Sequence, residues 1–252
     1  MLNIVIPMAG AGRRFADAGY RLPKPLILVH GTPMVKVVID NLRPSQAHRF
    51  IFIAQRAHDA AYDLCRNLAR WAPRSEVVLV DGMTEGAACT VLKARQLIDN
   101  QDALMIANSD QYVDADIDAY LAVMASDELD GLIMTMQADD PKWSYVGFDA
   151  GGHVDRVVEK QVISSKATVG IYNFRHGADF VAAAESMIAA GQRVNGEFYV
   201  EPVSKALIAR GKLIGTASVG AVGDGMHGLG TPQDLDAFLS LALSRHAAGD
   251  GT

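Results

Sequence analysis

Residues 3–15 of the chain read NIVIPMAGAGRRF, and this stretch decides the fold. The short, apolar and β-branched run from Asn3 to Pro7 predicts a buried strand. Four small residues and two arginines follow it: Ala9, Gly10, Ala11, Gly12, Arg13 and Arg14. Small residues after a strand let backbone N–H groups approach an anion, and arginines add positive charge. The stretch therefore predicts a phosphate-binding loop at the end of the first strand.

Similar apolar runs recur along the first half of the chain, at 50–54, 76–80, 103–107 and 132–136. Each is short and bounded by polar or turn residues, which is typical of parallel strands covered on both faces. Amphipathic stretches with helical spacing lie between them, at 34–42, 57–71, 86–98 and 117–124. The alternation predicts an α/β fold with a Rossmann-like, doubly wound and mostly parallel sheet.

The pattern changes after residue 138. Two strands are expected at 154–158 and 168–174 without a long helix between them, which predicts a small antiparallel insertion. Helices are expected again at 178–190, 199–209 and 232–247, before a frayed tail at 248–252. We expect one domain over residues 1–252, divided into the alternating part at 1–138, an elaboration at 139–230 and a C-terminal helix at 231–252.

The overall composition is that of an ordinary folded protein. Of the 252 residues, 50% are hydrophobic and 21% are charged, and the formal net charge is −6. An acidic chain has no general basic field for a nucleic-acid backbone, so nucleic acid is not an expected partner. Residues 1–25, however, hold four basic side chains and one acidic one, a local charge of +3. Positive charge is thus concentrated at the first loop.

The cysteines and the N-terminus indicate where the protein works. The two cysteines, Cys65 and Cys89, lack the spacing of a zinc or redox motif and are expected to be small buried residues. The first residues lack a basic segment, and their apolar run ends at Pro7, which is unlike a signal peptide or a membrane span. We expect a cytoplasmic protein with no membrane partner.

Two common phosphate-binding motifs do not fit the first loop. In GxGxxG, the third glycine would stand where this chain has Phe15, and the pattern GxxxxGK[ST] is absent from the sequence. A purely structural turn would explain the glycines but not the arginines, nor Lys24 between Pro23 and Pro25, where prolines stiffen the chain.

The segment 9–15 (AGAGRRF), followed by 22–26 (LPKPL), resembles the signature of the sugar-phosphate nucleotidylyltransferases, also called nucleoside-diphosphate-sugar pyrophosphorylases. Their signature runs GxGxR, then a spacer, then PK. That family joins an NTP to a phosphomonoester and releases pyrophosphate, on a Rossmann-like sheet similar to that of GT-A glycosyltransferases. The resemblance implies that Arg14 contacts the triphosphate and that Lys24 contacts the reacting phosphates.

Two further segments extend the nucleotide site. By the same resemblance, the segment 84–88 would line the base and ribose pocket with Glu85, Gly86 and Ala87, although an ordinary first helical turn also explains it. Ser109 and Asp110 follow the strand 103–107, and ligands bind at the carboxyl ends of such strands. Asp110 falls where the family has a metal-binding aspartate, and Mg²⁺ prefers carboxylate and phosphate oxygens. Mg²⁺ is therefore the expected cofactor.

The resemblance implies that residues 1–138 mainly bind the nucleotide and that residues 139–230 mainly bind the acceptor. Glu159 and Lys160 resemble the family's pair that holds the sugar and its phosphate, and the strand with Thr168 and Gly170 resembles its substrate-lining strand. The segment 195–200 resembles the one that carries an acceptor-binding glutamate, which points to Asn195 and Glu197. Tyr145 ends the turn-like segment 139–145, which is expected to be either a lid over the substrate or a plain β-turn.

One departure from the family concerns the metal. Many members have a second metal-binding aspartate where this chain has Gly228. Asp224, Glu197 or water could complete the Mg²⁺ shell, or one protein carboxylate could suffice. The neighbouring His227 could approach the phosphates or be structural.

The sequence thus predicts a Mg²⁺-dependent enzyme that transfers NMP from an NTP to a phosphomonoester, with a sugar 1-phosphate as the acceptor and surface polysaccharide synthesis as the role implied. A cytidylyltransferase acting on a polyol, choline or amino-acid phosphate is the alternative. A GT-A glycosyltransferase, using Asp114 and Asp116 as its metal motif, and a non-catalytic nucleotide-binding regulator are alternatives from other classes. The expected partners are the NTP and the phosphomonoester, with homo-oligomerisation left open.

Overall fold

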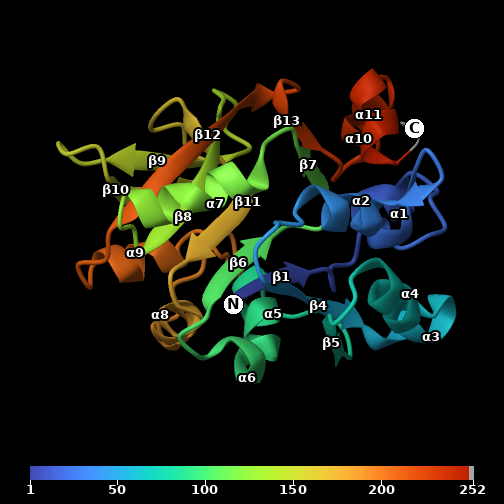
Figure 1. The fold of residues 1–252 in the computed structure, drawn as a ribbon, viewed down its shortest axis with the longest axis horizontal. Helices are drawn as coiled ribbons and strands as arrows, with labels where there is room; N and C mark the ends of the chain where they lie inside the picture. The colour runs from blue at the N-terminus through green and yellow to red at the C-terminus, as the bar shows by residue number, and fades with distance from the viewer. Residues whose placement is uncertain (250–252) are drawn as a thin grey trace.

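One mixed β-sheet organises residues 1–249, the part of the chain that the computed structural model describes (Figure 1). Its first half is parallel and has the strand order β5-β4-β1-β6. These strands are β1 (Leu2–Pro7), β4 (His48–Gln55), β5 (Glu76–Val80) and β6 (Ala103–Ala107). The parallel half confirms the expected α/β fold.

The second half of the sheet is mixed. β11 (Lys166–Phe174) pairs antiparallel with both β6 and β8 (Gly131–Gln137), and β12 (Ile214–Val222) runs parallel to β8. The sheet ends with β13 (Gly225–Gly228) and the antiparallel β7 (Gln111–Val113). A hairpin of β9 (Ser144–Phe148) and β10 (Val154–Glu159) extends from β11, and β2 (Leu28–Val29) and β3 (Thr32–Pro33) form a separate small sheet. The expected antiparallel insertion is therefore present.

Helices cover both faces of the sheet, because alternate side chains of each central strand point to opposite faces. On one face, Ile4, Phe50 and Met105 pack in a cluster with side chains of α2 (Met34–Asn41), α4 (Leu64–Trp71) and α7 (Ile117–Ser126). On the other face, Val5 and Ile51 pack with α5 (Ala87–Val91), α6 (Arg95–Ile98), α8 (Gly177–Ala189) and α9 (Val203–Ile208). The core is thus two apolar layers around one sheet.

A third apolar cluster joins the two ends of the chain. It contains Phe15 of α1 (Arg13–Asp17), Met34, and Phe238 of α10 (Pro232–Leu239). Figure 1 shows α10 and α11 (Ala242–Ala247), in red, beside the blue helices α1 and α2. Two hydrogen bonds connect the same regions. One joins His30 Nε2 and Ser244 Oγ at 2.8 Å, and in the other the Thr32 hydroxyl donates to the Ala248 carbonyl at 2.9 Å.

Several predicted helices are shorter or broken. The stretch 57–71 forms α3 (Arg56–Tyr62) and α4, separated at Asp63, whose φ of 50° is left-handed and ends the first helix. The stretch 86–98 forms α5, a 3₁₀ turn η2 (Leu92–Ala94) and α6. The stretch 199–209 is helical only as α9, because Pro202 disfavours helical backbone in the residue before it. The stretch 232–247 is interrupted between α10 and α11.

The strand predictions err in two ways. β5 is an edge strand with partly exposed side chains, so it is not covered on both faces as expected. The sequence analysis also misses several elements. These are the strands β9, β12, β13 and β7, the short strands β2 and β3, the helix α1 and the 3₁₀ turn η1 (Lys24–Leu26).

Three expectations about the rest of the chain can also be compared with the structure. In residues 1–249, no helix is long and apolar enough to cross a membrane. Cys65 and Cys89, expected to be buried, are free cysteines of intermediate exposure. Of the expected frayed tail, residues 250–252 lie outside the described part of the chain.

The buried hydroxyl of Tyr120 makes a testable contribution to stability. It donates a hydrogen bond to Asn173 Oδ1 at 2.9 Å and approaches the Leu132 carbonyl at 3.3 Å. Tyr120→Phe leaves a buried acceptor without this donor, which costs about 1–3 kcal/mol. We expect the melting temperature to fall by about 2–4 °C per kcal/mol. Tyr62→Phe, at a more exposed tyrosine, is the control, and equal melting temperatures for the two variants would contradict this role for Tyr120.

Candidate functional site

A first cavity of about 460 Å³ opens at the carboxyl end of β1. Of the predicted nucleotide-binding residues, those that line it are Ala9, Gly10, Ala11, Gly12, Arg13, Gly86 and Ala87. Met83, Thr84, Thr90, Asn108 and Glu197 line it as well. The loop after β1 and the loop after β5 therefore share one cavity, because their strands lie in the same parallel sheet with β4 between them.

Gly12 determines how the first loop meets the segment with Lys24. Its φ is 59°, in the left-handed region, and an added Cβ would lie 3.2 Å from Lys24 Cβ. A side chain at this position would therefore combine backbone strain with crowding. The close approach lets Lys24 Nζ reach Asp110 Oδ2 at 2.8 Å, in a partly buried ion pair. The first loop, Lys24 and the end of β6 thus form one unit.

A second cavity of about 200 Å³ adjoins the first. The predicted residues that line it are Arg14, Asp110, Glu159, Thr168 and Gly170. Its wall also includes polar residues that the sequence analysis did not select: Asn108, Gln111, Lys142, Ser144, Glu201 and Asp234. Asn108 lines both cavities. The two cavities therefore meet at the carboxyl end of β6, with Arg13 and Arg14 directed to different ones.

Two amide side chains stand against Gly170 at this junction. The φ of Gly170 is 83°, and an added Cβ would lie 3.0 Å from Gln111 Oε1 and 2.8 Å from Asn108 Cγ. Only glycine fits both this left-handed backbone and these neighbours. In addition, the Asn108 backbone N–H donates to the Gly170 carbonyl at 3.1 Å. The absence of a side chain at Gly170 therefore leaves room for the two amide side chains that form the polar wall between the two cavities.

A pair of glutamates forms the far wall of the second cavity. The Ser144 hydroxyl donates to Glu159 Oε2 and lies 3.4 Å from Glu201 Oε1. Burial raises the pKa of the Glu201 carboxyl, and the negative charge of Glu159 raises it further. Tyr172, whose hydroxyl donates to Thr168 Oγ1 at 2.9 Å, also has a pKa raised by burial. This wall presents several oxygen atoms that accept hydrogen bonds.

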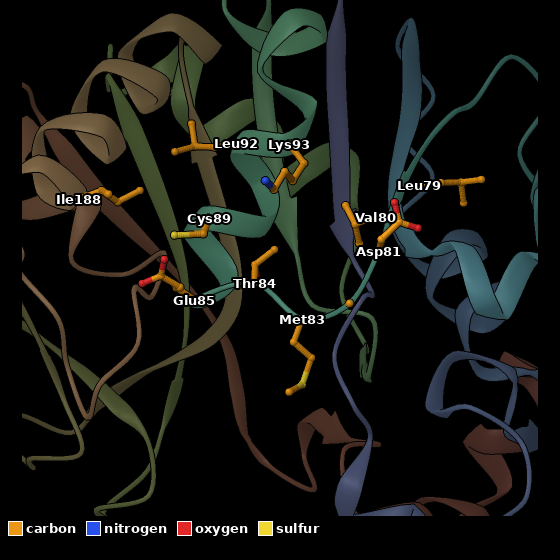
Figure 2. Close-up of a pocket in the computed structure, with 11 residues that line it drawn as sticks. Leu79, Val80, Asp81, Met83, Thr84, Glu85, Cys89, Leu92, Lys93 and Ile188 are labelled. Atoms are coloured by element: carbon orange, nitrogen blue, oxygen red, sulfur yellow. The ribbon is translucent and has the colours of Figure 1, made fainter.

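Two of the predicted glutamates lie elsewhere than expected. Glu85 forms an ion pair with Arg193 and lines a neighbouring cavity of about 640 Å³, which shares Met83 and Thr84 with the first cavity. Figure 2 shows the side chains of Glu85 and Cys89 pointing toward Ile188 in that cavity. Glu197, expected at the acceptor, lines the first cavity because the backbone of the next residue, Phe198, packs against Gly86.

Five other predicted residues do not line the two cavities: Lys24, whose ion pair with Asp110 is described above, and Tyr145, Ser109, Lys160 and Asn195. Tyr145 is fully buried, and its hydroxyl donates to the Asp140 carbonyl at 2.8 Å. Ser109 is also buried. The side chain of Lys160 is 50% exposed and lies 3.8 Å from Glu159 Oε1. Asn195 occupies a left-handed turn with a φ of 49°. The side chain of Tyr145 therefore belongs to the core, and its role at the acceptor stays a prediction.

The residues near Gly228, where many family members have a second metal-binding aspartate, make the following contacts. His227 packs between Tyr112 and Phe238, with ring centroids at 6.2 and 5.3 Å, and burial lowers its pKa, so its position is structural. Gly228 lies beside Asp234. Asp224, in the turn between β12 and β13, is not part of the second cavity's wall in residues 1–249.

The donor set of the second cavity suits a hard cation. Its acidic and amide side chains offer oxygen atoms, which Mg²⁺ prefers. No cluster of three or more His, Cys, Asp or Glu side chains could hold a metal by itself within residues 1–249. Because Mg²⁺ commonly binds through one or two carboxylates together with substrate phosphates, Asp110 is compatible with such a site.

The comparison with protein families matches residues 4–200 to the model described as Nucleotidyl transferase. This chain belongs to the nucleotidyl transferase family. The matched range includes both amide residues at the junction, Lys24, Asp110 and Glu159. The resemblance seen in the first loop and in the LPKPL segment is therefore confirmed.

Solved structures agree with this family. A nucleoside-diphosphate-sugar pyrophosphorylase from Vibrio cholerae RC9 is 26% identical, with a TM-score of 0.78, over 94% of this chain and 100% of the other. An inositol-1-phosphate CTP transferase from T. maritima shares the fold at 12% identity and a TM-score of 0.72, over 98% and 94%. A putative glucose-1-phosphate thymidylyltransferase from Bacillus anthracis shares it at 17% and 0.72, over 100% and 97%. The comparison with curated proteins finds no match.

This nucleotidyl transferase is thus an enzyme of the nucleotidyltransferase class. The glycosyltransferase alternative depended on Asp114 and Asp116. In the structure, Asp116 is the N-cap of α7, and its side chain accepts hydrogen bonds from the backbone N–H groups of Asp118 and Ala119. Its carboxylate therefore stabilises a helix start.

The buried Glu201 predicts a pH effect on the stability of this nucleotidyl transferase. Because its pKa is raised in the folded state, the folded protein retains a proton that the unfolded chain releases. Stability is therefore lost as the pH rises from the ordinary glutamate pKa through the raised one. Glu201→Gln removes this loss, so the melting temperature of the variant, relative to that of the wild type, should rise as the pH increases above the ordinary glutamate pKa of about 4.5.

Melting curves at several pH values measure this gain. Glu76→Gln, at an exposed glutamate that begins β5, is the control and should follow the wild type. A constant difference between Glu201→Gln and the wild type across the pH range would refute the prediction.

Proposed function

We propose that this enzyme transfers NMP from an NTP to a sugar 1-phosphate in a Mg²⁺-dependent reaction. A phosphate oxygen of the acceptor attacks the α-phosphorus of the NTP and forms a new P–O bond. The bond from the α-phosphorus to the bridging oxygen breaks, and pyrophosphate leaves with its electron pair. The products are an NDP-sugar and pyrophosphate.

The observation that carries this proposal is the meeting of two cavities at Asn108. The larger cavity adjoins the glycine-rich loop, and the smaller one has a basic side chain, Arg14, and a wall of acidic oxygens. In-line transfer requires two substrates whose reacting phosphates face each other, so two adjoining cavities suit the reaction. We infer that the larger one binds the NTP and the smaller one the acceptor, with residues 1–138 contributing mainly to the first.

The chain's own residues would mainly align two polyanions. The nucleophile is already an anion near neutral pH, so the reaction needs no general base. Backbone N–H groups of residues 10–13 would hold the triphosphate, while Arg14 and Lys24 would stabilise charge on the α-phosphoryl group and on the departing pyrophosphate. Lys24, which lies 2.8 Å from Asp110 Oδ2, is near that centre of charge.

Asp110 would hold Mg²⁺ together with the substrate phosphates. When bound there, the ion would screen phosphate charge and act as a Lewis acid. The position of Asp110 after the end of β6 and its place on the wall of the second cavity support this role.

The glutamate pair supports a hydroxyl-rich acceptor. Glu159, Glu201 and Ser144 offer oxygens that can accept hydrogen bonds from sugar hydroxyls. An aromatic cage would favour a quaternary ammonium group such as that of choline, and the aromatic side chain on this wall among residues 1–249 is Trp143. We therefore propose a sugar 1-phosphate, with the product serving surface polysaccharide synthesis.

A matrix of substrates tests the proposed function. CTP, UTP, dTTP and GTP are each combined with sugar 1-phosphates, a polyol phosphate, phosphocholine and an amino-acid phosphate, and pyrophosphate release is measured. We expect release with a sugar 1-phosphate and one preferred NTP. Release only with a non-sugar phosphate would replace the acceptor class, and tight NTP binding without any turnover would identify a non-catalytic regulator.

Substitutions at the basic residues test their role. Lys24→Ala and Arg14→Ala should each lose about 2–4 kcal/mol of transition-state stabilisation, by analogy with the loss of an oxyanion donor. The rate constant for pyrophosphate release should therefore fall by about 30- to 1000-fold. Arg21→Ala, at an exposed arginine of the same basic segment, is the control. Rates near that of the wild type in both variants would exclude the assignment.

A further inference from the structure

Gly228 does not need to be glycine for conformational reasons. It ends β13 and pairs with Gln111 of β7. Its backbone is not among the positive-φ glycines of the described residues, and an added Cβ would meet Asp234 at ordinary contact distances of 3.5–3.6 Å. The space in front of Gly228 is therefore filled by the carboxyl group of Asp234.

The start of α10 holds Asp234 in this position. Thr231, the N-cap, accepts a hydrogen bond from the Asp234 backbone N–H at 3.1 Å. Its hydroxyl donates to Asp234 Oδ2 at 2.7 Å. The carboxylate is thus oriented by the helix N-terminus, while the residue also lines the second cavity.

Asp110 approaches the same short segment. A Cβ added to Gly230 would lie 2.7 Å from Asp110 Oδ2, and the Leu229 backbone N–H donates to the Asp110 carbonyl at 2.8 Å. Asp110 and Asp234 therefore both contact residues 228–230 and both line one cavity. Two carboxylates from different elements converge there.

An independent feature indicates that this cavity is built around a ligand. Gln111 is 4% exposed and lines the cavity, and its Nε2 has no hydrogen-bond partner within the described residues 1–249. A buried donor without a partner is costly, and native proteins usually satisfy it with water or a ligand. A ligand with acceptor oxygens, such as a phosphate, would satisfy it beside the two carboxylates.

We propose that Asp234, from helix α10, supplies the second protein carboxylate toward Mg²⁺, in place of an aspartate at position 228. Two carboxylates plus substrate phosphates form the oxygen donor set that Mg²⁺ commonly uses. The inference rests on the proposed function, since it assumes that Mg²⁺ is held together with substrate phosphates where the two cavities meet.

Metal binding provides the test. The full-length protein is titrated with Mn²⁺, a paramagnetic substitute for Mg²⁺, in the presence of a non-hydrolysable α,β-methylene NTP, and bound Mn²⁺ is measured by electron paramagnetic resonance. Loss of a carboxylate ligand in Asp234→Asn should weaken Mn²⁺ binding by about tenfold or more. Asp236→Asn removes a charge from the exposed side of the same helix and should leave the affinity unchanged.

A relocated carboxylate separates metal binding from helix capping. In the double variant Asp234→Ala/Gly228→Asp, truncation of the side chain at residue 234 empties the space in front of position 228, so the new aspartate has room. The carboxylate then returns to the cavity from β13. We expect Mn²⁺ affinity within about threefold of the wild type, which is less than the tenfold loss above. A purely capping role predicts a lower melting temperature and no recovery.

The outcomes are distinct for the two proposals. Unchanged Mn²⁺ affinity in Asp234→Asn, or a loss that the relocated aspartate does not restore, would overturn the inference while leaving the nucleotidyl transfer itself intact. Absence of pyrophosphate release from the wild type with every substrate pair would overturn the proposed function. The Mn²⁺ titration would still decide the role of Asp234 in that case.

Discussion

The ion pair between Lys24 and Asp110 depends on the pairing of two central strands. β1 and β6 are neighbours in parallel register, with Val5 opposite Ile106, so the loops that follow them open side by side. Gly12 then allows the backbone around Lys24 to approach the first loop. The 2.8 Å contact between Nζ and Oδ2 therefore joins loops that are distant in sequence. Because Asp110 also lines the second cavity, the contact links the first loop to the wall of that cavity.

Burial explains which elements could be predicted from the sequence. β5 and β6 have the predicted bounds because their residues form apolar runs between polar ones. β12 reads IGTASVGAV, and its side chains are mostly part-exposed, so no apolar run distinguishes it. Helix ends depended on single residues such as Asp63 and Pro202, whose backbone effects interrupt an otherwise continuous amphipathic pattern. Hydrophobic periodicity therefore predicts which segments form strands and helices better than it predicts the residues at which they begin and end.

The residues that line the cavities could also be predicted only in part from the sequence. Residues of the glycine-rich loop and the strand ends could be selected because several of them occur together in a recognisable segment. Asn108, Gln111, Ser144, Glu201 and Asp234 come from separate elements, and each is an ordinary polar residue in its own neighbourhood. Packing against Gly170 brings Asn108 and Gln111 together, while Asp234 reaches the same wall from the start of α10. An unpaired buried amide such as that of Gln111 has no counterpart in a sequence pattern.

The cluster that joins the chain ends has a consequence for biosynthesis. Phe15 and Met34 leave the ribosome early, whereas Leu235 and Phe238, which complete their apolar environment, are added more than 190 residues later. The parallel strands β1, β4 and β6 can pair before then, but the helix that follows the glycine-rich loop lacks part of its packing. A nascent chain would therefore contain most of the sheet and still expose the apolar side of its first loop, making that region a natural contact for chaperones during synthesis.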